Sequence, residues 1–211
     1  MSFTWLDSYE NEKMQFSEFE TIVRTNVDED EVDIVSSANL MAVTNEGLRE
    51  MAFQAEVMRD YCTIAADGSE KYTLPSDLIK VKSVLWETNG NIEYLVNATE
   101  ADNRSAIGKY SIVGNQLYVY GSISTGNIKV HASKMPTKIT SASSYIDIPY
   151  EYIYTLGLYV EWRYWRRKRA LRESTEAFNF YFQSMRDLMV KNEQKNERGV
   201  KLFGKVSQTK R

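Results

Sequence analysis

The stretch from residue 146 to residue 164 reads IDIPYEYIYTLGLYVEWRY and opens the C-terminal part of the chain. Proline is favoured in the first turn of a helix, so Pro149 indicates a helix start, and Asp147 is a candidate cap for it. Apolar residues then follow on one helical stripe: Ile153, Leu156, Val160 and Tyr164. The pattern predicts a helix from Tyr150 to about Ala170.

A second helix is expected after a break at residues 172–176, with Ser174 as a candidate N-cap. Its apolar residues are spaced 4, 3 and 4 apart and therefore share one face: Phe178, Phe182, Met185 and Met189. Beyond residue 194 the chain turns polar and basic, with Leu202 and Phe203 among its few apolar residues. Such a segment is expected to order on a partner rather than fold alone.

The N-terminal region, to residue 58, also has helical spacing. Phe16, Phe19 and Val23 indicate one helix, and apolar residues between 46 and 58 indicate another. Thr44 or Asn45 is the candidate cap of that second helix.

Between these regions, the chain changes to short β-rich runs separated by turn signals. The clearest is the run YSIVGNQLYVY at residues 110–120, which predicts a hairpin turning at Gly114-Asn115. Asp67-Gly68 and the run Asn89-Gly90-Asn91 mark further turns. Five or six short strands at this spacing predict a small antiparallel sandwich or barrel.

The expected fold class is therefore α+β, with a helical bundle made from the N- and C-terminal helices and a small antiparallel β module inserted between them. The expected parts are 1–58, the N-terminal helices; 59–148, the β module; 149–194, a helical hairpin packing on the N-terminal helices; and 195–211, a flexible basic tail.

The composition leaves little material for catalysis. The 211 residues contain one cysteine, Cys62, and one histidine, His131. His131 is expected on the strand face opposite Ile128, Val130 and Ala132, and Cys62 is expected to be a small buried apolar residue. No phosphate-binding, dinucleotide-binding or hydrolase motif is present. We therefore expect neither an enzyme nor a cofactor or metal site.

No apolar run reaches the ~18 residues of a membrane span, and the first residues do not resemble a signal peptide.

Charge is segregated along the chain, although its formal net charge is only −3. Residues 1–60 hold 14 acidic and 4 basic residues, whereas residues 163–172 hold six basic residues and no acidic one. Residues 191–211 carry a net charge of +5. This asymmetry indicates electrostatic contact with a partner, either nucleic acid or a neighbouring copy. Arginines interleaved with Trp162, Tyr164 and Trp165 suit a nucleic-acid surface and a protein interface equally well.

Several short runs carry a resemblance to the head–tail adaptor proteins of tailed bacteriophages. They are GSEKYTLPSDLIKV at 68–81, YSIVGNQLYV at 110–119, GNIKV at 126–130, Met135-Pro136, and IDIPYEY at 146–152. The resemblance spans residues 40–190. The basic stretch at 163–172 and the basic tail depart from the family's pattern.

The resemblance implies a ring, usually of about twelve copies, beneath the portal vertex in the virion neck. Such a ring extends the DNA channel and offers a platform for the tail. Implied partners are further copies, the portal protein, tail or neck proteins, and genomic DNA contacted without sequence preference, with no membrane involved. The resemblance also implies that the protein is made in the cytoplasm of the bacterial host.

Seven residues are the candidate interface: Arg163, Arg166, Arg167, Arg169, Arg172, Leu202 and Phe203. The arginines are expected to contact another subunit or the portal, or to face the DNA channel, and Leu202 and Phe203 to anchor the tail on a partner ring.

Two alternatives remain open. One is another neck or tail component, such as a tail-completion or fibre-attachment protein, which a copy number of three or six would favour. The other is a nucleic-acid-binding module that uses the arginine-rich helix.

Overall fold

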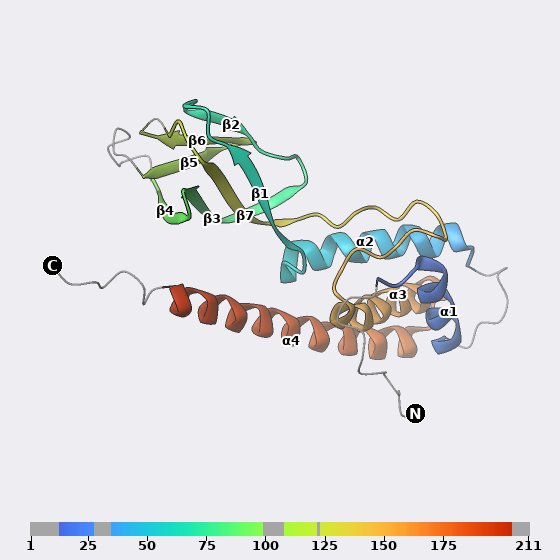
Figure 1. The fold of residues 1–211 in the computed structure, drawn as a ribbon. Coiled ribbons are helices and arrows are strands. Elements are labelled where there is room, and N and C mark those ends of the chain that lie inside the picture. Colours follow the sequence, from blue (N-terminus) through green and yellow to red (C-terminus); the bar gives the residue numbers. More distant parts are fainter. Residues whose placement is uncertain (1–12, 28–34, 99–107, 122, 204–211) are drawn as a thin grey trace. The chain divides into compact units, whose positions relative to one another are not determined.

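A computed structural model describes residues 13–27, 35–98, 108–121 and 123–203, with only the backbone described from residue 194 onward (Figure 1). The chain divides into two compact units, one formed by Met1–Val57 with Pro136–Arg211 and the other by Met58–Met135. The first unit contains the helices and the second contains the strands.

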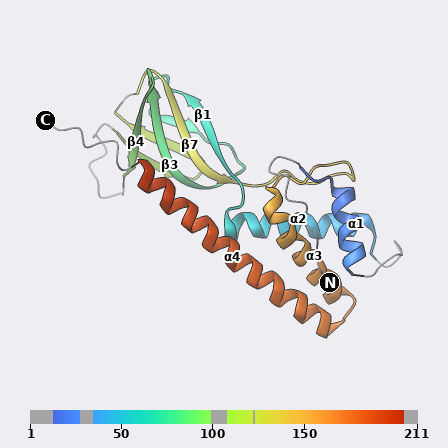
Figure 2. The same ribbon diagram turned by 60° about the horizontal axis from the view of Figure 1, so that its bottom comes forward.

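The helical unit contains α1 (Phe16–Asn26), α2 (Ser37–Ala55), the short 3-10 helix η1 (Tyr150–Tyr152), α3 (Ile153–Arg167) and α4 (Leu171–Phe203). Within this unit, α3 lies between α1 and α4 (Figure 2). All four residues of the stripe predicted for α3 are buried, because α3 is covered by other helices along that stripe.

The caps of two helices differ from those predicted. The second N-terminal helix begins at Ser37 rather than near residue 46, because the Ser36 hydroxyl accepts a hydrogen bond from Asn39 N at 3.4 Å. Thr44 lies inside that helix, buried, and donates to Leu40 O at 2.8 Å. Ser174 is also not a cap: α4 begins at Leu171, and Ser174 N donates to Ala170 O at 2.9 Å within its first turn.

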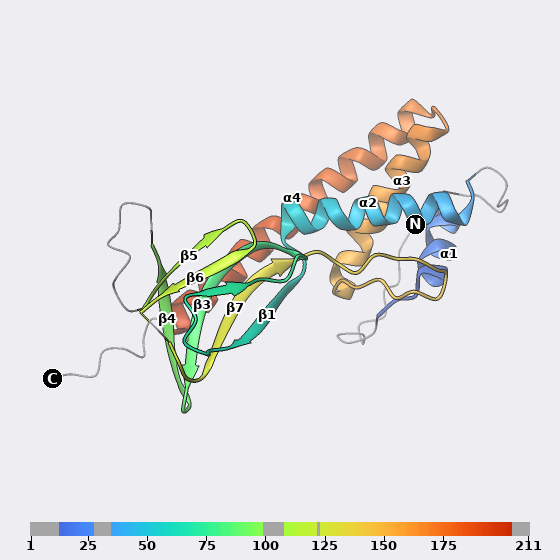
Figure 3. The same cartoon turned by 90° about the horizontal axis from the view of Figure 1, so that it is seen from above.

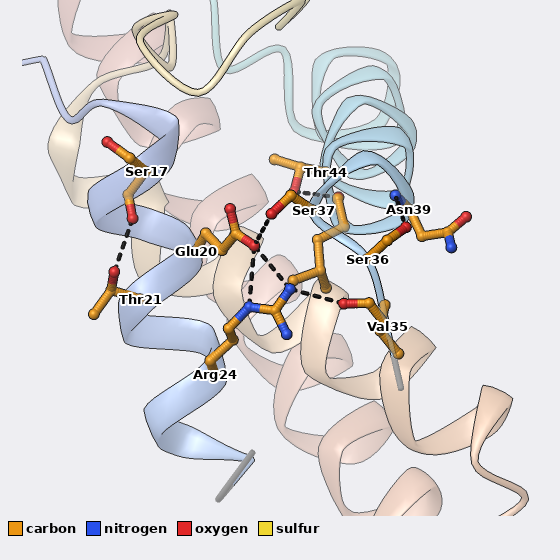
Figure 4. A network of polar contacts seen from close by, with 10 residues as sticks. Ser17, Glu20, Thr21, Arg24, Val35, Ser36, Ser37, Asn39 and Thr44 are labelled. Atoms are coloured by element: carbon orange, nitrogen blue, oxygen red, sulfur yellow. Dashed lines mark hydrogen bonds and ion pairs between the residues drawn. The ribbon is translucent and has the colours of Figure 1, made fainter. Parts of the chain in front are cut away.

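A polar network joins α1 to the start of α2 (Figure 4). Arg24 Nη2 lies 2.8 Å from Glu20 Oε1 and donates to Val35 O at 2.7 Å. Ser37 Oγ donates to the same Glu20 oxygen at 2.5 Å. The Arg24 and Glu20 side chains are each 13% exposed, so this ion pair within α1 is shielded from solvent. The bonds to Ser37 and to Val35 O connect the pair to the start of α2.

Residues 136–148 precede η1 and belong to the helical unit, although the sequence analysis assigned them to the β module. Ile139 and Ile146 are buried there. The side chain of Asn45 bonds both the N–H and the carbonyl of Ile139, at 2.8 and 2.9 Å. Phe16 N donates to Ser144 O at 2.9 Å. These bonds hold the segment against α1 and α2.

The inward face of α4 is not the one suggested by its largest apolar residues. Phe178, Phe182 and Met189 are 38%, 55% and 39% exposed, and only Met185 of the predicted set is buried. The buried residues of the helix follow a neighbouring line: Ser174, Ala177, Tyr181, Met185, Leu188 and Asn192. Asn192 tolerates burial because it donates to Ala55 O at 2.6 Å and accepts from Tyr152 Oη at 2.9 Å.

The described part of the second unit forms one seven-stranded sheet in the order β1-β7-β3-β4-β5-β6-β2, which curls into a nearly closed barrel (Figure 3). Its strands are β1 (Arg59–Ala65), β2 (Lys71–Thr73), β3 (Leu78–Thr88), β4 (Asn91–Asn97), β5 (Lys109–Val113), β6 (Gln116–Tyr120) and β7 (Asn127–Lys134). The predicted hairpin at 110–120 is confirmed as β5 and β6. The turn at Asn89-Gly90 is confirmed too, and both residues have positive φ, 48° and 78°.

The predicted fold class, a helical bundle carrying a small antiparallel β module, is wrong. The chain is a mixed α+β protein in which the barrel-like sheet is a principal body. Two features overturn the prediction. The 11-residue strand β3 pairs with both β7 and β4, so it joins strands into one large sheet. In addition, β4 and β5 pair in parallel at Val96–Lys109, so the sheet is not purely antiparallel.

The sheet encloses a core of its own. The inward residues of β7 are Ile128, Val130 and Ala132, all completely buried, and His131 lies on the other face, as predicted. The rest of this core is Tyr72, Leu74, Val84, Leu95, Tyr110, Leu117, Val119 and Ile123. Cys62 packs against it while remaining partly exposed.

Two helical glycines provide a matched test of packing. A Cβ at Gly47 would lie 2.7 Å from Tyr159 Cδ1 and 2.9 Å from Leu156 Cδ1, whereas at Gly157 the nearest contact is 4.0 Å away. We expect Gly47→Ala to lower the free energy of unfolding by about 1–2 kcal/mol, because overpacking exceeds the gain in helix propensity. Gly157→Ala is expected to be neutral or to stabilise by up to about 1 kcal/mol. Urea unfolding measures both, and equal effects would contradict the packing.

Glu161 provides a pH-dependent test. Burial raises the pKa of its carboxyl, and the hydrogen bond from Asn26 Nδ2, at 2.7 Å, offsets only part of this effect. A raised pKa in the folded state means that the ionised form destabilises the fold as pH rises through that pKa. We expect Glu161→Gln to increase the free energy of unfolding at pH 7. The gain should vanish below the ordinary pKa of 4.5, where Glu161 is protonated in both states. Glu176→Gln, at an exposed position of α4, is the control.

Candidate functional site

The predicted arginines divide into two groups in the structure. Arg163 is held within the helical unit: its Nη2 lies 2.9 Å from Glu46 Oε2 of α2. Its guanidinium also lies over the rings of Tyr159 and Trp162, at 5.8 and 5.7 Å from their centroids. Arg163 therefore connects α3 to α2, and its guanidinium makes contacts within the helical unit.

The other four arginines are exposed where α3 turns into α4, and we call them the basic corner: Arg166, Arg167, Arg169 and Arg172. Arg166 and Arg167 occupy the last turn of α3, where the helix dipole stabilises positive charge. Arg169 adopts φ of 59° in the turn, and Arg172 lies in the first turn of α4. The geometry brings these four charges to one end of the α3–α4 pair.

Lys168 belongs to the same basic stretch but is engaged with aromatic rings. Its Nζ lies 4.6 Å from the centroid of Tyr164 and 6.0 Å from that of Trp165. These cation–π contacts fix the side chain beside the end of α3.

An aromatic cluster connects the interior of the helical unit to its surface. Tyr159 is completely buried and contacts Trp162 and Tyr181, with ring centroids 5.5 and 5.3 Å apart. Trp162 in turn contacts Phe178 at 5.0 Å, and Phe178 stacks on Phe182 at 6.1 Å. Burial raises the pKa of the Tyr159 and Tyr181 phenols, so both stay neutral and serve the packing.

The outer end of this cluster belongs to a line of exposed apolar side chains, which we call the α4 apolar stripe. It consists of Leu171, Phe178, Phe182 and Met189, which are 80%, 38%, 55% and 39% exposed. Phe178, Phe182 and Met189 were predicted to share one face of the helix, and that face is exposed. The helical spacing indicated the stripe, and only the structure reveals that the described residues leave it exposed.

The remaining candidates lie elsewhere along the chain. Leu202 and Phe203 lie on the last turn of α4, which continues through part of the predicted tail, and their side chains are outside the described residues. His131 stacks on Tyr61 with ring centroids 4.7 Å apart. The Cys62 thiol has its pKa raised by burial and by the nearby Asp77 and Asp60 carboxylates.

Among the residues that the structure describes, no three His, Cys, Asp or Glu side chains gather into a group able to hold a metal ion. Within the same described parts of the chain, no helix is long and apolar enough to span a membrane. What the helical unit does offer is a basic corner next to exposed aromatic side chains, an arrangement suited to contact with another macromolecule.

This surface, built on a helical unit joined to a barrel-like sheet, defines an interaction protein. The model of the SU10 adaptor protein family matches residues 14–202, and the chain belongs to that family. The match confirms the predicted resemblance to phage head–tail adaptors. The protein is accordingly a structural adaptor of a bacteriophage, a component of the virion that interacts with other phage head or tail proteins. A search of curated proteins found no match.

The two groups of arginines predict different mutational effects. Arg163→Met removes an ion pair and two cation–π contacts, so we expect the free energy of unfolding to fall by about 1 kcal/mol. Arg167→Met removes an exposed side chain, so the change should stay within about 0.5 kcal/mol. Urea unfolding of both variants checks this, and an equal loss from Arg167→Met would contradict the division.

Proposed function

We propose that the protein is a head–tail adaptor that assembles into a ring of about twelve copies beneath the portal, in the neck of the virion. The ring extends the DNA channel and provides the platform on which the tail attaches. The observation that carries this proposal is the family match, which covers nearly all of both units. Its action is binding and positioning, without a catalytic step.

A closed ring needs two different surfaces on each copy, because each copy meets its neighbours head to tail. The helical unit offers a candidate for one of these surfaces. It presents the α4 apolar stripe together with the basic corner, and the described residues leave both exposed. Apolar and aromatic side chains supply most of the affinity at protein interfaces, and charges at their rim select the partner.

The basic corner has a second role in this proposal. Four clustered guanidinium groups would attract the phosphates of DNA passing through the channel, or acidic groups on the portal. Such contacts act without sequence preference, as a channel requires. Arg163 is left out of this role because Glu46 already binds it.

The proposal is tested by negative-stain imaging of the protein mixed with the portal ring encoded in the same genome. We expect an added layer with the portal's rotational symmetry. A variant with Arg166, Arg167, Arg169 and Arg172 all changed to Glu should lose the layer or the infectivity of the phage, while Arg163→Met should keep both. A folded protein that adds no layer to the portal would contradict the proposal.

The exposed arginines beside Trp165 also favour a second candidate, a nucleic-acid-binding module. This candidate predicts that the isolated protein binds duplex DNA with an affinity that falls steeply with salt concentration. Another neck or tail component, such as a tail-completion or fibre-attachment protein, would instead be present in three or six copies. Copy number and salt dependence therefore separate the three candidates.

A further inference from the structure

The α4 apolar stripe is a straight line of side chains on the outside of a helix. Its members are spaced 7, 4 and 7 residues apart, which places them within a narrow arc at 3.6 residues per turn. Phe178 and Phe182 are stacked on each other, and Phe178 is held against Trp162. These rings are already fixed in place, so an occupant would bind without first ordering them. Large apolar side chains exposed along one face of a helix are typical of a docking site.

The charge beside the stripe limits what can dock there. Leu171 begins the stripe at the turn between α3 and α4, directly beside Arg169 and Arg172 of the basic corner. An occupant should therefore be rich in large apolar side chains and should carry acidic groups near one end.

One segment of this chain outside the described residues has that composition. Residues 1–12 read MSFTWLDSYENE, with Phe3, Trp5, Leu6 and Tyr9 as large apolar or aromatic residues. Acidic residues follow in its second half, namely Asp7, Glu10 and Glu12, and it contains no Lys or Arg. Residues 204–211, by contrast, carry three basic residues and no acidic one, so the basic corner would repel them.

We propose that residues 1–12 of one copy bind the α4 apolar stripe of the neighbouring copy, with their acidic half on the basic corner. The inference names the contact between subunits and rests on the ring proposed above. The segment then serves as an arm that joins adjacent adaptors. Twelve residues reach up to about 40 Å when extended, which is enough to cross to a neighbour.

The exit point of the segment favours the neighbour over the copy's own stripe. Lys13 Nζ lies 2.9 Å from Asp147 Oδ1, and Met14 O accepts from Ile146 N at 2.9 Å, so the chain enters α1 beside the segment that precedes η1. These contacts fix the point from which the arm departs.

The helix α3 lies between α1, where the arm departs, and α4, which carries the stripe (Figure 2). On α3, Glu161 bonds Asn26 of α1, while Thr155 and Trp162 contact Ser184 and Phe178 of α4. At 100° per residue, these two contact faces of α3 lie on average about 110° apart. A head-to-tail ring brings different faces of adjacent copies into contact, so the arm of one copy and the stripe of the next can meet.

Photo-crosslinking in the portal-bound ring tests the proposal. The photoreactive residue p-benzoylphenylalanine replaces Trp5, and 15N-labelled and unlabelled copies are mixed before assembly. We expect crosslinks from position 5 to peptides containing residues 171–189, joining labelled to unlabelled chains. Crosslinks confined to a single chain, or directed to another element, in a ring that has formed would overturn the arm and leave the proposed function standing.

Two substitutions on α4 form a matched control pair. Phe182 and Phe180 are similarly exposed, at 55% and 51%, but they point to nearly opposite sides of the helix. We expect Phe182→Asp to lower the crosslink yield about tenfold and Phe180→Asp to leave it unchanged. Equal yields from the two variants would overturn the proposal. Failure to form any ring on the portal would overturn the proposed function and the arm with it.

Discussion

The helical unit depends on the close approach of α2 to α3 at Gly47. Because Gly47 has no side chain, the Tyr159 ring and the Leu156 side chain fill the space that a Cβ would occupy. Tyr159 is then completely buried and supports Trp162 and Tyr181. The same approach brings Arg163 to Glu46. Through Trp162 the packing reaches Phe178, so one glycine in the interior determines the aromatic surface on α4.

Much of the local structure was predictable from the sequence. The stripe of α3 was predicted correctly: its four residues are all buried, because other helices cover that side. On α4 the spacing predicted a shared face but not its exposure, since the helix has two neighbouring apolar lines and periodicity cannot tell which one the chain covers. Asn192 was missed as a buried residue because its two hydrogen-bond partners lie far away in the sequence. The predicted fold class was wrong for a similar reason. The pairing of the long strand β3 with β7 and the parallel pairing of β4 with β5 join residues that are far apart in the sequence.

The candidate surface was predictable only in part. A run of basic residues is visible in the sequence, but the structure separates Arg163, which binds Glu46, from four arginines that remain exposed. The run of basic residues does not show which arginines are paired, because the pairing depends on an acidic residue of a neighbouring helix, Glu46 of α2. The resemblance to head–tail adaptors was carried mainly by short runs in and after the sheet, and the family match over residues 14–202 agrees with it.

A ring-forming adaptor requires surfaces that its own fold leaves uncovered, and the exposed stripe and basic corner of the helical unit meet that requirement. The most direct measurement is a cryo-electron microscopy reconstruction of the portal vertex in the intact virion, into which the two units are fitted independently. The account predicts a complete ring of this protein between the portal and the tail, with the stripe and the corner at contacts. Finding the protein elsewhere in the particle, or in three or six copies, would contradict it.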